Sequence, residues 1–161
     1  MLTKTIRSRI KYYCLGVSIL LDQKEYSKWM ASAEKTLKSA YIDLDTEFYN
    51  WACFKAHQAA EKALKALLWG CGKPGIRHTL PKLLENIKEL GVKVPEKIKE
   101  NCIRLSKYYT ITRYPDVWEN GIPEDYFTVN EAREAIKMAE EVIKWVKDTW
   151  GKLISEAKQI T

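Results

Sequence analysis

The chain has 161 residues, of which 46% are hydrophobic and 30% are charged, so its composition is that of a soluble single domain and excludes a disordered chain. The formal net charge is +6, but residues 1–23 carry a surplus of three positive charges and no dense basic run follows them. Because the segment 113–131 is acidic, the charge distribution disfavours binding of a nucleic-acid backbone over the main body.

The first 23 residues combine basic residues with a short apolar run between Cys14 and Leu21. A small-residue cleavage site is missing, which argues against a signal peptide. The run is also much shorter than the roughly 20 apolar residues that span a membrane. We therefore interpret residues 1–23 as a poorly constrained arm that docks through its aliphatic residues, Leu21 among them. Residues 24–161 are predicted to form one domain with no membrane segment.

The next two segments have the spacing of amphipathic helices. Ser27 is the expected N-cap of the first helix. Asp43 lies near the C-terminal end of this helix, where a carboxylate opposes the helix dipole and is expected to need a partner. The second helix is predicted over residues 51–69, after a turn at Tyr49–Asn50, and ends at the glycine-rich segment 70–75.

Three further helices are predicted along the chain. Thr79 caps the third helix and Pro95 opens the fourth. Residues 110–127 contain two prolines and a glycine and are expected to form an irregular loop. Thr128 and Glu131 form a capping box ahead of the last helix. The apolar residues of that helix have a heptad spacing, which suits either bundle packing or a dimer interface.

The sequence contains no alternating strand pattern of useful length and no internal repeat. The predicted fold class is therefore all-α, an up-and-down helical bundle of four to five helices. The four cysteines form no Cys-x-x-Cys pair, so Cys53 and Cys102 are expected to be small core residues. We predict no metal and no cofactor, and a cytoplasmic location, where cysteines stay reduced.

Two places concentrate polar residues against an apolar background. The second helix carries His57, Glu61 and Lys65 at four-residue steps along the edge of its apolar stripe. An antiparallel hairpin of the first two helices brings Asp43 toward the start of this helix. The second place is the segment around Arg113, where an arginine follows two tyrosines. Arginine suits recognition of a phosphate or carboxylate, and its plane stacks on tyrosine.

Three motifs carry a family resemblance. They are Ala-Cys-Phe-x-Ala-x-Gln-Ala-Ala-Glu-Lys-Ala-Leu-Lys-Ala-Leu-Leu in the second helix, then His-Thr-Leu-x-x-Leu-Leu, then Tyr-x-x-x-Arg-Tyr-Pro-Asp. Over about residues 24–150, this combination resembles the HEPN domain family, named for higher eukaryotes and prokaryotes nucleotide-binding. The resemblance implies a helical bundle that forms a homodimer. It also implies a minimal nucleotidyltransferase as partner in a two-component, toxin–antitoxin-like pair.

Many members of that family are metal-independent ribonucleases with an Arg-x4-6-His motif. This chain lacks the motif, because His57 and His78 are its only histidines and neither follows an arginine at that spacing. The resemblance therefore implies a non-catalytic binding module. It implies Asp43, Glu61, Arg113 and Tyr114 as polar positions that bind a nucleotide phosphate or a segment of the partner.

Alternatives stay open for these residues. Glu61 and Arg113 either form a buried ion pair that ties the second helix to the loop or belong to a ligand site. His57 is expected to be a core-edge histidine and His78 a turn residue, and both stay candidates for ligand or partner binding. The alternative function is a metal-independent ribonuclease toxin with a non-standard active site. Whether the chain binds nucleic acid is left open.

Overall fold

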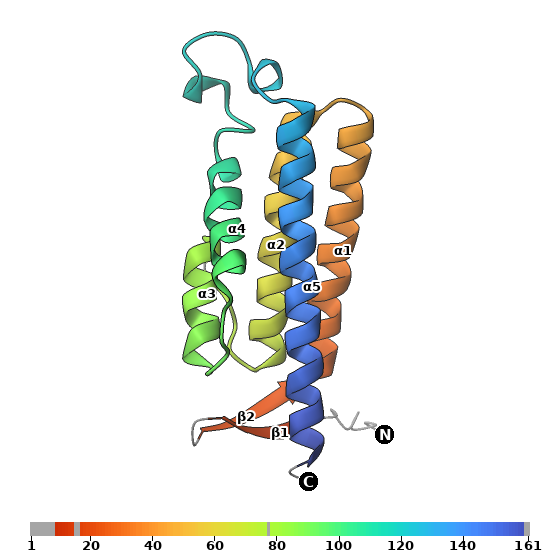
Figure 1. The fold of residues 1–161 in the computed structure, drawn as a ribbon, viewed down its shortest axis with the longest axis vertical. Coiled ribbons are helices and arrows are strands. Elements are labelled where there is room, and N and C mark those ends of the chain that lie inside the picture. The colour runs from red at the N-terminus through yellow and green to blue at the C-terminus, as the bar shows by residue number, and fades with distance from the viewer. Residues whose placement is uncertain (1–8, 15–16, 77, 160–161) are drawn as a thin grey trace, which may run out of the picture.

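The computed structural model describes residues 9–14, 17–76 and 78–159. Within these residues, five α-helices form an up-and-down bundle with a two-stranded hairpin at one end, so the predicted all-α helical bundle is confirmed (Figure 1). The elements are β1 (Arg9–Cys14), β2 (Val17–Asp22), α1 (Gln23–Asp45), α2 (Tyr49–Gly70), α3 (Leu80–Glu89), α4 (Glu96–Ser106) and α5 (Val129–Gln159).

The helix α2 is the centre of the bundle. It contacts α1, α3, α4 and α5, and Figure 1 shows it between the long helices α1 and α5 and the shorter pair α3 and α4. Small side chains allow this close approach from several sides. Six alanines of α2 are fully buried: Ala52, Ala56, Ala59, Ala60, Ala63 and Ala66. A polar side chain on α2 therefore lies close to the core wherever it emerges.

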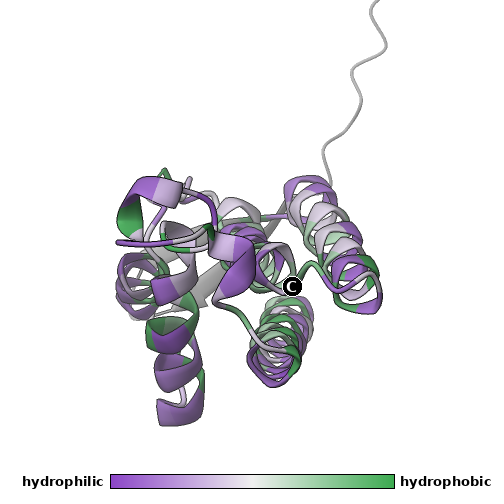
Figure 2. Ribbon diagram, turned by 90° about the horizontal axis from the view of Figure 1, so that it is seen from above, coloured by the Kyte–Doolittle hydropathy of each residue, from purple (hydrophilic) through white to green (hydrophobic). Residues whose placement is uncertain are grey.

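The helix α5 closes the bundle through its heptad seam. All six residues of that seam are buried in the single chain: Ala132, Ile136, Ala139, Ile143, Val146 and Trp150. Of the two uses predicted for this spacing, the structure shows packing within the bundle. Figure 2 looks down the bundle and shows hydrophobic and hydrophilic residues on different sides of the same helices, as amphipathic packing requires.

Most helix ends agree with the sequence, and two do not. Helix α2 already begins at Tyr49, so the turn predicted at Tyr49–Asn50 is wrong. At α5, the Glu131 amide donates to Thr128 Oγ1 at 3.3 Å and the Thr128 amide donates to Glu131 Oε2 at 2.9 Å, so the capping box is confirmed. The predicted cap at Ser27 is wrong. The N-cap of helix α1 lies five residues earlier, because Asp22 accepts the Glu25 amide at 3.1 Å and supplies the cap.

The hairpin corrects the expectation that the chain contains no strand. The strands β1 and β2 pair in antiparallel register, with Arg9 opposite Asp22 and Cys14 opposite Val17. A strand of six residues contains too few alternating positions to stand out in a sequence. The tyrosines and β-branched residues of this segment nevertheless favour strands. Leu21 is 1% exposed, so the expectation that it docks on the bundle is confirmed. The division into an arm and a domain stays a prediction.

The buried cysteines behave as core residues. Cys53 and Cys102 are fully buried, as predicted, and burial raises the pKa of each thiol to about 12. Within the described part of the chain, no group of three or more metal-ligating side chains is placed to hold an ion. No helix in residues 23–159 is both long and apolar enough to cross a bilayer.

Candidate functional site

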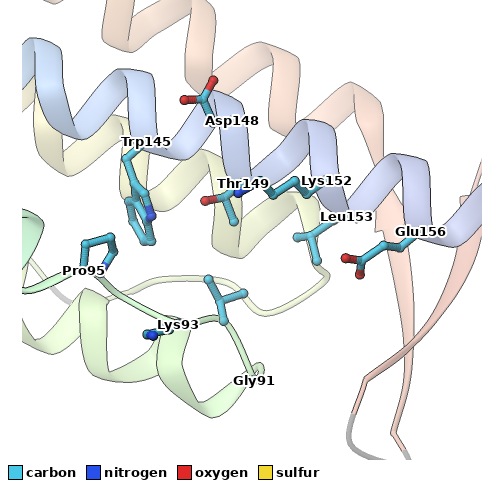
Figure 3. Close-up of a pocket in the computed structure, with 10 residues that line it drawn as sticks. Gly91, Lys93, Pro95, Trp145, Asp148, Thr149, Lys152, Leu153 and Glu156 are labelled. Carbon is cyan, nitrogen blue, oxygen red and sulfur yellow. The ribbon is translucent and has the colours of Figure 1, made fainter.

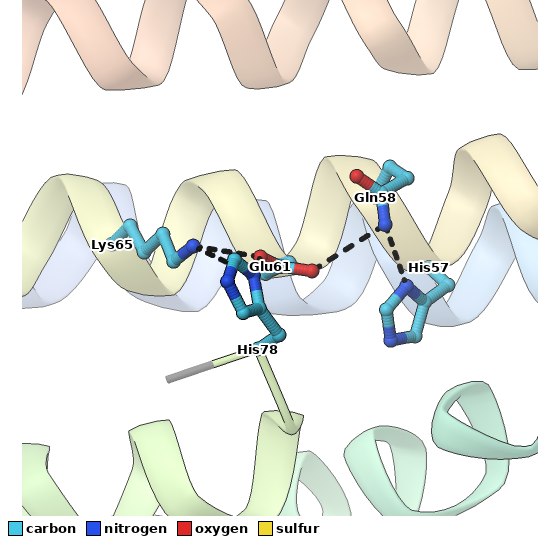
Figure 4. Close-up of polar contacts among 5 residues, drawn as sticks. All are labelled: His57, Gln58, Glu61, Lys65 and His78. Atoms are coloured by element: carbon cyan, nitrogen blue, oxygen red, sulfur yellow. Dashed lines mark hydrogen bonds and ion pairs between the residues drawn. The ribbon is translucent and has the colours of Figure 1, made fainter. Parts of the chain in front are cut away.

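A polar stripe runs along α2 toward the connector between α2 and α3 (Figure 4). The buried Lys65 ammonium lies 2.7 Å from Glu61 Oε1, and His78 Nδ1 lies 3.0 Å from the same oxygen. The other carboxylate oxygen, Glu61 Oε2, accepts a bond from Gln58 Nε2 at 3.4 Å. We call Gln58, Glu61, Lys65 and His78 the Glu61 cluster.

The Glu61 cluster stabilises two charges that are nearly excluded from water. Glu61 is 5% exposed and Lys65 is 6% exposed. Such burial is tolerated only when each charge has a partner, and the four-residue spacing on one helix supplies it. His78 differs from both, because 67% of its side chain is exposed. It is therefore the member of the cluster that a ligand can reach.

His57 lies one turn before Glu61 and is buried. Its side chain is 1% exposed, its Nδ1 lies 3.3 Å from Gln58 Nε2, and its ring centre lies 5.4 Å from that of Tyr109. Burial lowers the pKa of His57 to about 4; the Glu61 charge opposes this shift and the Arg113 charge adds to it. His57 is therefore a neutral core histidine near pH 7, which agrees with the expectation from the sequence that it lies at the edge of the core.

Arg113 forms a second cluster with aromatic rings, which we call the Arg113 cluster. Its guanidinium carbon lies 4.4 Å from the ring centre of Phe54, 4.8 Å from that of Tyr109 and 4.9 Å from that of Tyr114. Its Nε and Nη2 donate to the Tyr109 carbonyl at 2.9 and 2.6 Å. These contacts are cation–π interactions and hydrogen bonds, and they hold the cation without a carboxylate.

Of the two alternatives for Glu61 and Arg113, the ion pair between them is therefore wrong. Among the described residues, the ion pairs of Glu61 are with Lys65 and His78, and Arg113 has none. The physical reason is local, since Arg113 lies four residues after Tyr109 in a turn and reaches back to its carbonyl. The two clusters still adjoin, because the His57 ring meets Tyr109 on one side and Gln58 on the other.

Asp43 belongs to a different contact. The Lys55 ammonium lies 2.7 Å from Asp43 Oδ2 and ties the end of α1 to the first turns of α2. This pair gives the carboxylate at the C-terminal end of α1 the partner that the sequence predicted it would need. The structure therefore brings Glu61 and His78 together, with His57 next to them and Arg113 beyond, and leaves Asp43 outside both clusters.

Asn50, on the first turn of α2, holds the loop that carries Arg113 through hydrogen bonds, and the sequence analysis did not identify it as a functional residue. The buried Asn50 donates through Nδ2 to the Thr112 carbonyl at 3.0 Å and to Glu124 Oε1 at 3.1 Å. The indole of Trp118 donates to the Ile111 carbonyl at 2.9 Å and stacks on Tyr126 with ring centres 4.0 Å apart. The signal that could have identified the role of Asn50 is an asparagine at the start of an alanine-rich helix.

The braced loop presents apolar side chains to solvent. Five of them are between 41% and 48% exposed: Tyr109, Tyr114, Val117, Ile122 and Tyr126. We call these five residues the loop surface. Two carboxylates, Asp116 and Glu119, lie in the same loop, and neither forms an ion pair within the part of the chain that the structure describes.

Comparison with known proteins places this geometry in a family. The family model of the HEPN domain matches residues 26–149. A protein of Methanocaldococcus jannaschii that is named as a candidate toxin is 28% identical over 134 residues, which cover 77% of this chain and 88% of the relative.

Three solved structures share the fold. A protein of Thermus thermophilus is 36% identical, with a TM-score of 0.75, over 78% of this chain and 98% of its own. An archaeal HEPN homologue is 35% identical, with a TM-score of 0.66, over 79% and 98%. An HEPN domain protein of Thermotoga maritima is 30% identical, with a TM-score of 0.64, over 77% and 98%.

Proposed function

The chain belongs to the HEPN domain family, and from this premise we propose that it is a toxin–antitoxin-associated binding module. Its relative in Methanocaldococcus jannaschii carries the name of a candidate toxin, which supports this setting. In the proposal, the chain forms a homodimer and acts as the non-catalytic partner of a minimal nucleotidyltransferase.

The loop surface is the observation that carries this proposal. Five apolar side chains with more than 40% exposure lie within 18 residues of one loop. Clustered exposed apolar residues are typical of protein interfaces, where tyrosines contribute much of the binding energy. Because Asn50 and Trp118 brace the loop, it loses little conformational entropy on binding. A preformed apolar surface of this kind suits a protein partner.

The burial of His57 favours binding over catalysis. A general base for RNA cleavage must reach the ribose hydroxyl within hydrogen-bond distance. His57 is 1% exposed, and its neighbour Tyr109 covers the ring. Arg113 already donates to the Tyr109 carbonyl, and an acidic loop follows it, which repels a phosphate chain.

The experiment for this proposal is to mix the chain with a minimal nucleotidyltransferase-fold protein from the same organism and to test for a complex. We expect one complex in size-exclusion chromatography with light scattering. Tyr114→Ser and Val117→Ser are expected to weaken binding about tenfold each, because each removes exposed apolar area from the loop surface. The control is Ile103→Ser on α4, which removes a side chain that is 47% exposed away from the loop. Absence of any complex would overturn the proposal.

One observation favours the ribonuclease alternative. The exposed His78 is oriented by a buried carboxylate, with the Lys65 ammonium 3.4 Å from its Nδ1. A histidine held by a carboxylate beside a cation has the parts of an acid–base site. Incubation with single-stranded and structured RNA tests this alternative. Cleavage that His78→Gln and Glu61→Gln both abolish would support it, whereas intact RNA supports the binding module.

Nucleotide binding at the two clusters forms the last part of the proposal. The Arg113 guanidinium provides a cation for a phosphate, the aromatic rings around it provide stacking faces for a base, and the exposed His78 ring provides a further hydrogen-bonding group. Isothermal titration with ATP and GTP is expected to give heat that Arg113→Ala reduces. No heat at millimolar ligand would exclude this part while leaving the protein partner untouched.

A further inference from the structure

A recess lies between the connector after α3 and the C-terminal half of α5 (Figure 3). Its volume is about 690 Å³, within the range of small-molecule sites. One wall is the connector with Lys93 and Pro95, and the other is α5 with Trp145, Thr149 and Lys152. None of these residues belongs to the Glu61 cluster, the Arg113 cluster or the loop surface.

The recess has an aromatic wall and an apolar base. Trp145 is half-buried, with part of its indole packed against the core and part lining the recess. Val92 and Leu153 add aliphatic surface beside it. Figure 3 shows Trp145 and Leu153 extending from α5 toward the connector. A flat ring can therefore stack on the indole and displace water from apolar surface.

The cations of the recess are available, and its carboxylates are engaged. Lys93 and Lys152 are exposed, come from opposite walls, and form no ion pair among the described residues. Asp148 is held by the Lys144 ammonium at 2.7 Å, and its pKa is lowered by this bond and, to a smaller extent, by the charge of Lys152. Glu156 also has a contact of its own and is not free. The uncompensated charge at the recess is therefore positive.

We propose that this recess binds a planar aromatic anion, a ring that carries a phosphate or a carboxylate. The ring stacks on Trp145 over Val92 and Leu153, and the anionic group lies between Lys93 and Lys152. Thr149 provides a hydroxyl on the same wall for a hydrogen bond to the ligand. A mononucleotide and an aromatic carboxylate share this chemistry, and they are distinguished by titration.

The recess is independent of the proposed partner site. Figure 1 shows the loop after α4 at one end of the bundle, whereas the connector between α3 and α4 lies at the other. A variant at Arg113 therefore leaves the recess intact, and a variant at Lys152 leaves the loop surface intact. The test of this site therefore does not depend on whether the chain binds a nucleotidyltransferase.

The experiment is titration of the full chain with AMP, 2-naphthoate, adenosine and inorganic phosphate, followed by calorimetry and by the indole N–H signal of Trp145. We expect AMP or 2-naphthoate to bind and to shift that signal, which a Trp145→Phe sample identifies. Lys93→Ala and Lys152→Ala are each expected to weaken binding about fivefold, and Trp145→Ala about tenfold. The variant Lys137→Ala, elsewhere on α5, is expected to bind as the wild type does. Because the Trp145 signal reports only on this recess, it separates binding here from binding at the Arg113 cluster.

Each outcome decides the proposal. Binding of AMP but not of 2-naphthoate supports a nucleotide as the ligand, and the reverse supports an aromatic carboxylate. The proposal is overturned if inorganic phosphate binds as tightly as AMP. It is also overturned if neither AMP nor 2-naphthoate gives heat or shifts the Trp145 signal. Undiminished affinity in Lys93→Ala and Lys152→Ala also overturns it. Thermal unfolding of each variant identifies any that fails to fold, and Trp145→Phe then replaces Trp145→Ala.

Discussion

At the scale of single residues, His57 shows how burial decides between a structural and a catalytic role. The side chain stands on the same stripe as Glu61, and sequence spacing alone leaves both roles open. The structure encloses its ring between Gln58 and Tyr109, so the neutral form is the one that fits. The cost of charging this histidine then appears as a dependence of stability on pH.

We predict that stability falls as the pH is lowered from about 6.5 toward 4. The folded pKa of His57 is about 4 and the ordinary value is 6.5, so within that window the unfolded chain binds a proton that the folded chain does not. The full contribution, about 3 kcal/mol, is present above pH 6.5 and lost by pH 4. Urea unfolding at several pH values measures it. His57→Gln is expected to flatten this slope, and an unchanged slope would contradict the prediction.

The buried pair of Glu61 and Lys65 gives a second prediction. Lys65→Met or Glu61→Gln removes one charge and leaves the other without its main partner, at an expected cost of about 3 kcal/mol in the free energy of unfolding. The double variant is expected to cost clearly less than the sum. The control is Lys82→Met, which breaks an exposed pair with Glu85 and is expected to cost far less, because solvent screens exposed pairs. Equal effects of Lys65→Met and Lys82→Met would show that the Glu61 cluster adds no special stability.

The direction of each side chain explains which contacts of Glu61 could be predicted from the sequence. The pairing of Glu61 with Lys65 follows from helix geometry, because residues four apart share a face. The sequence analysis considered an ion pair between Glu61 and Arg113 as one of two alternatives, and the structure excludes it. Arg113 turns back to the Tyr109 carbonyl, and His78 reaches Glu61 from a connector that sequence periodicity does not describe.

At the scale of helices, α2 approaches α1 and α5 closely at Gly70. A Cβ atom there would lie 2.7 Å from Cζ3 of Trp150 and 2.9 Å from Cβ of Tyr26, closer than packed atoms allow. These two rings stack with centres 4.3 Å apart and an interplanar angle of 6°, so they cannot shift independently. The glycine therefore lets the end of α2 meet both α1 and α5.

Two glycine variants test this contact with opposite signs. Gly70→Ala is expected to destabilise the chain by about 1–3 kcal/mol through overpacking. Gly151→Ala is expected to stabilise it by about 0.5–1 kcal/mol, because no atom lies within 4 Å of a Cβ there and alanine favours the helix. Urea unfolding at about pH 7.5, above the window in which His57 titrates, measures both. The packing argument fails if the two variants change stability in the same direction.

Helices with complete local signals were predictable, and elements that depend on pairing were not. The capping box at Thr128 and the heptad seam specify α5 by themselves. The start of α1 was misplaced because Asp22 caps it directly after a strand, and that strand exists only through its register with β1. The loop surface was read as irregular chain, since its bracing by Asn50 joins residues 62 positions apart.

At the scale of the whole molecule, charge is unevenly distributed. The chain carries a net charge of +6, yet the loop that bears the loop surface is acidic. Asp116 and Glu119 form no ion pair within the described residues, so their field reaches solvent. A basic partner is attracted to this end of the bundle, whereas a second copy or an RNA strand approaching the same end meets carboxylates.

We therefore predict that the complex with the nucleotidyltransferase-fold partner depends on salt through this loop. The variant carrying Asp116→Lys and Glu119→Lys is expected to associate at least about tenfold more slowly at low ionic strength, because electrostatic steering is lost. The rate of this variant is expected to change little between low and high salt, since screening has less attraction to remove. Stopped-flow mixing measures both rates. The variant carrying Glu96→Lys and Glu100→Lys on α4 changes the net charge equally, so a similar slowing there would show that total charge, and not the acidic loop, controls association.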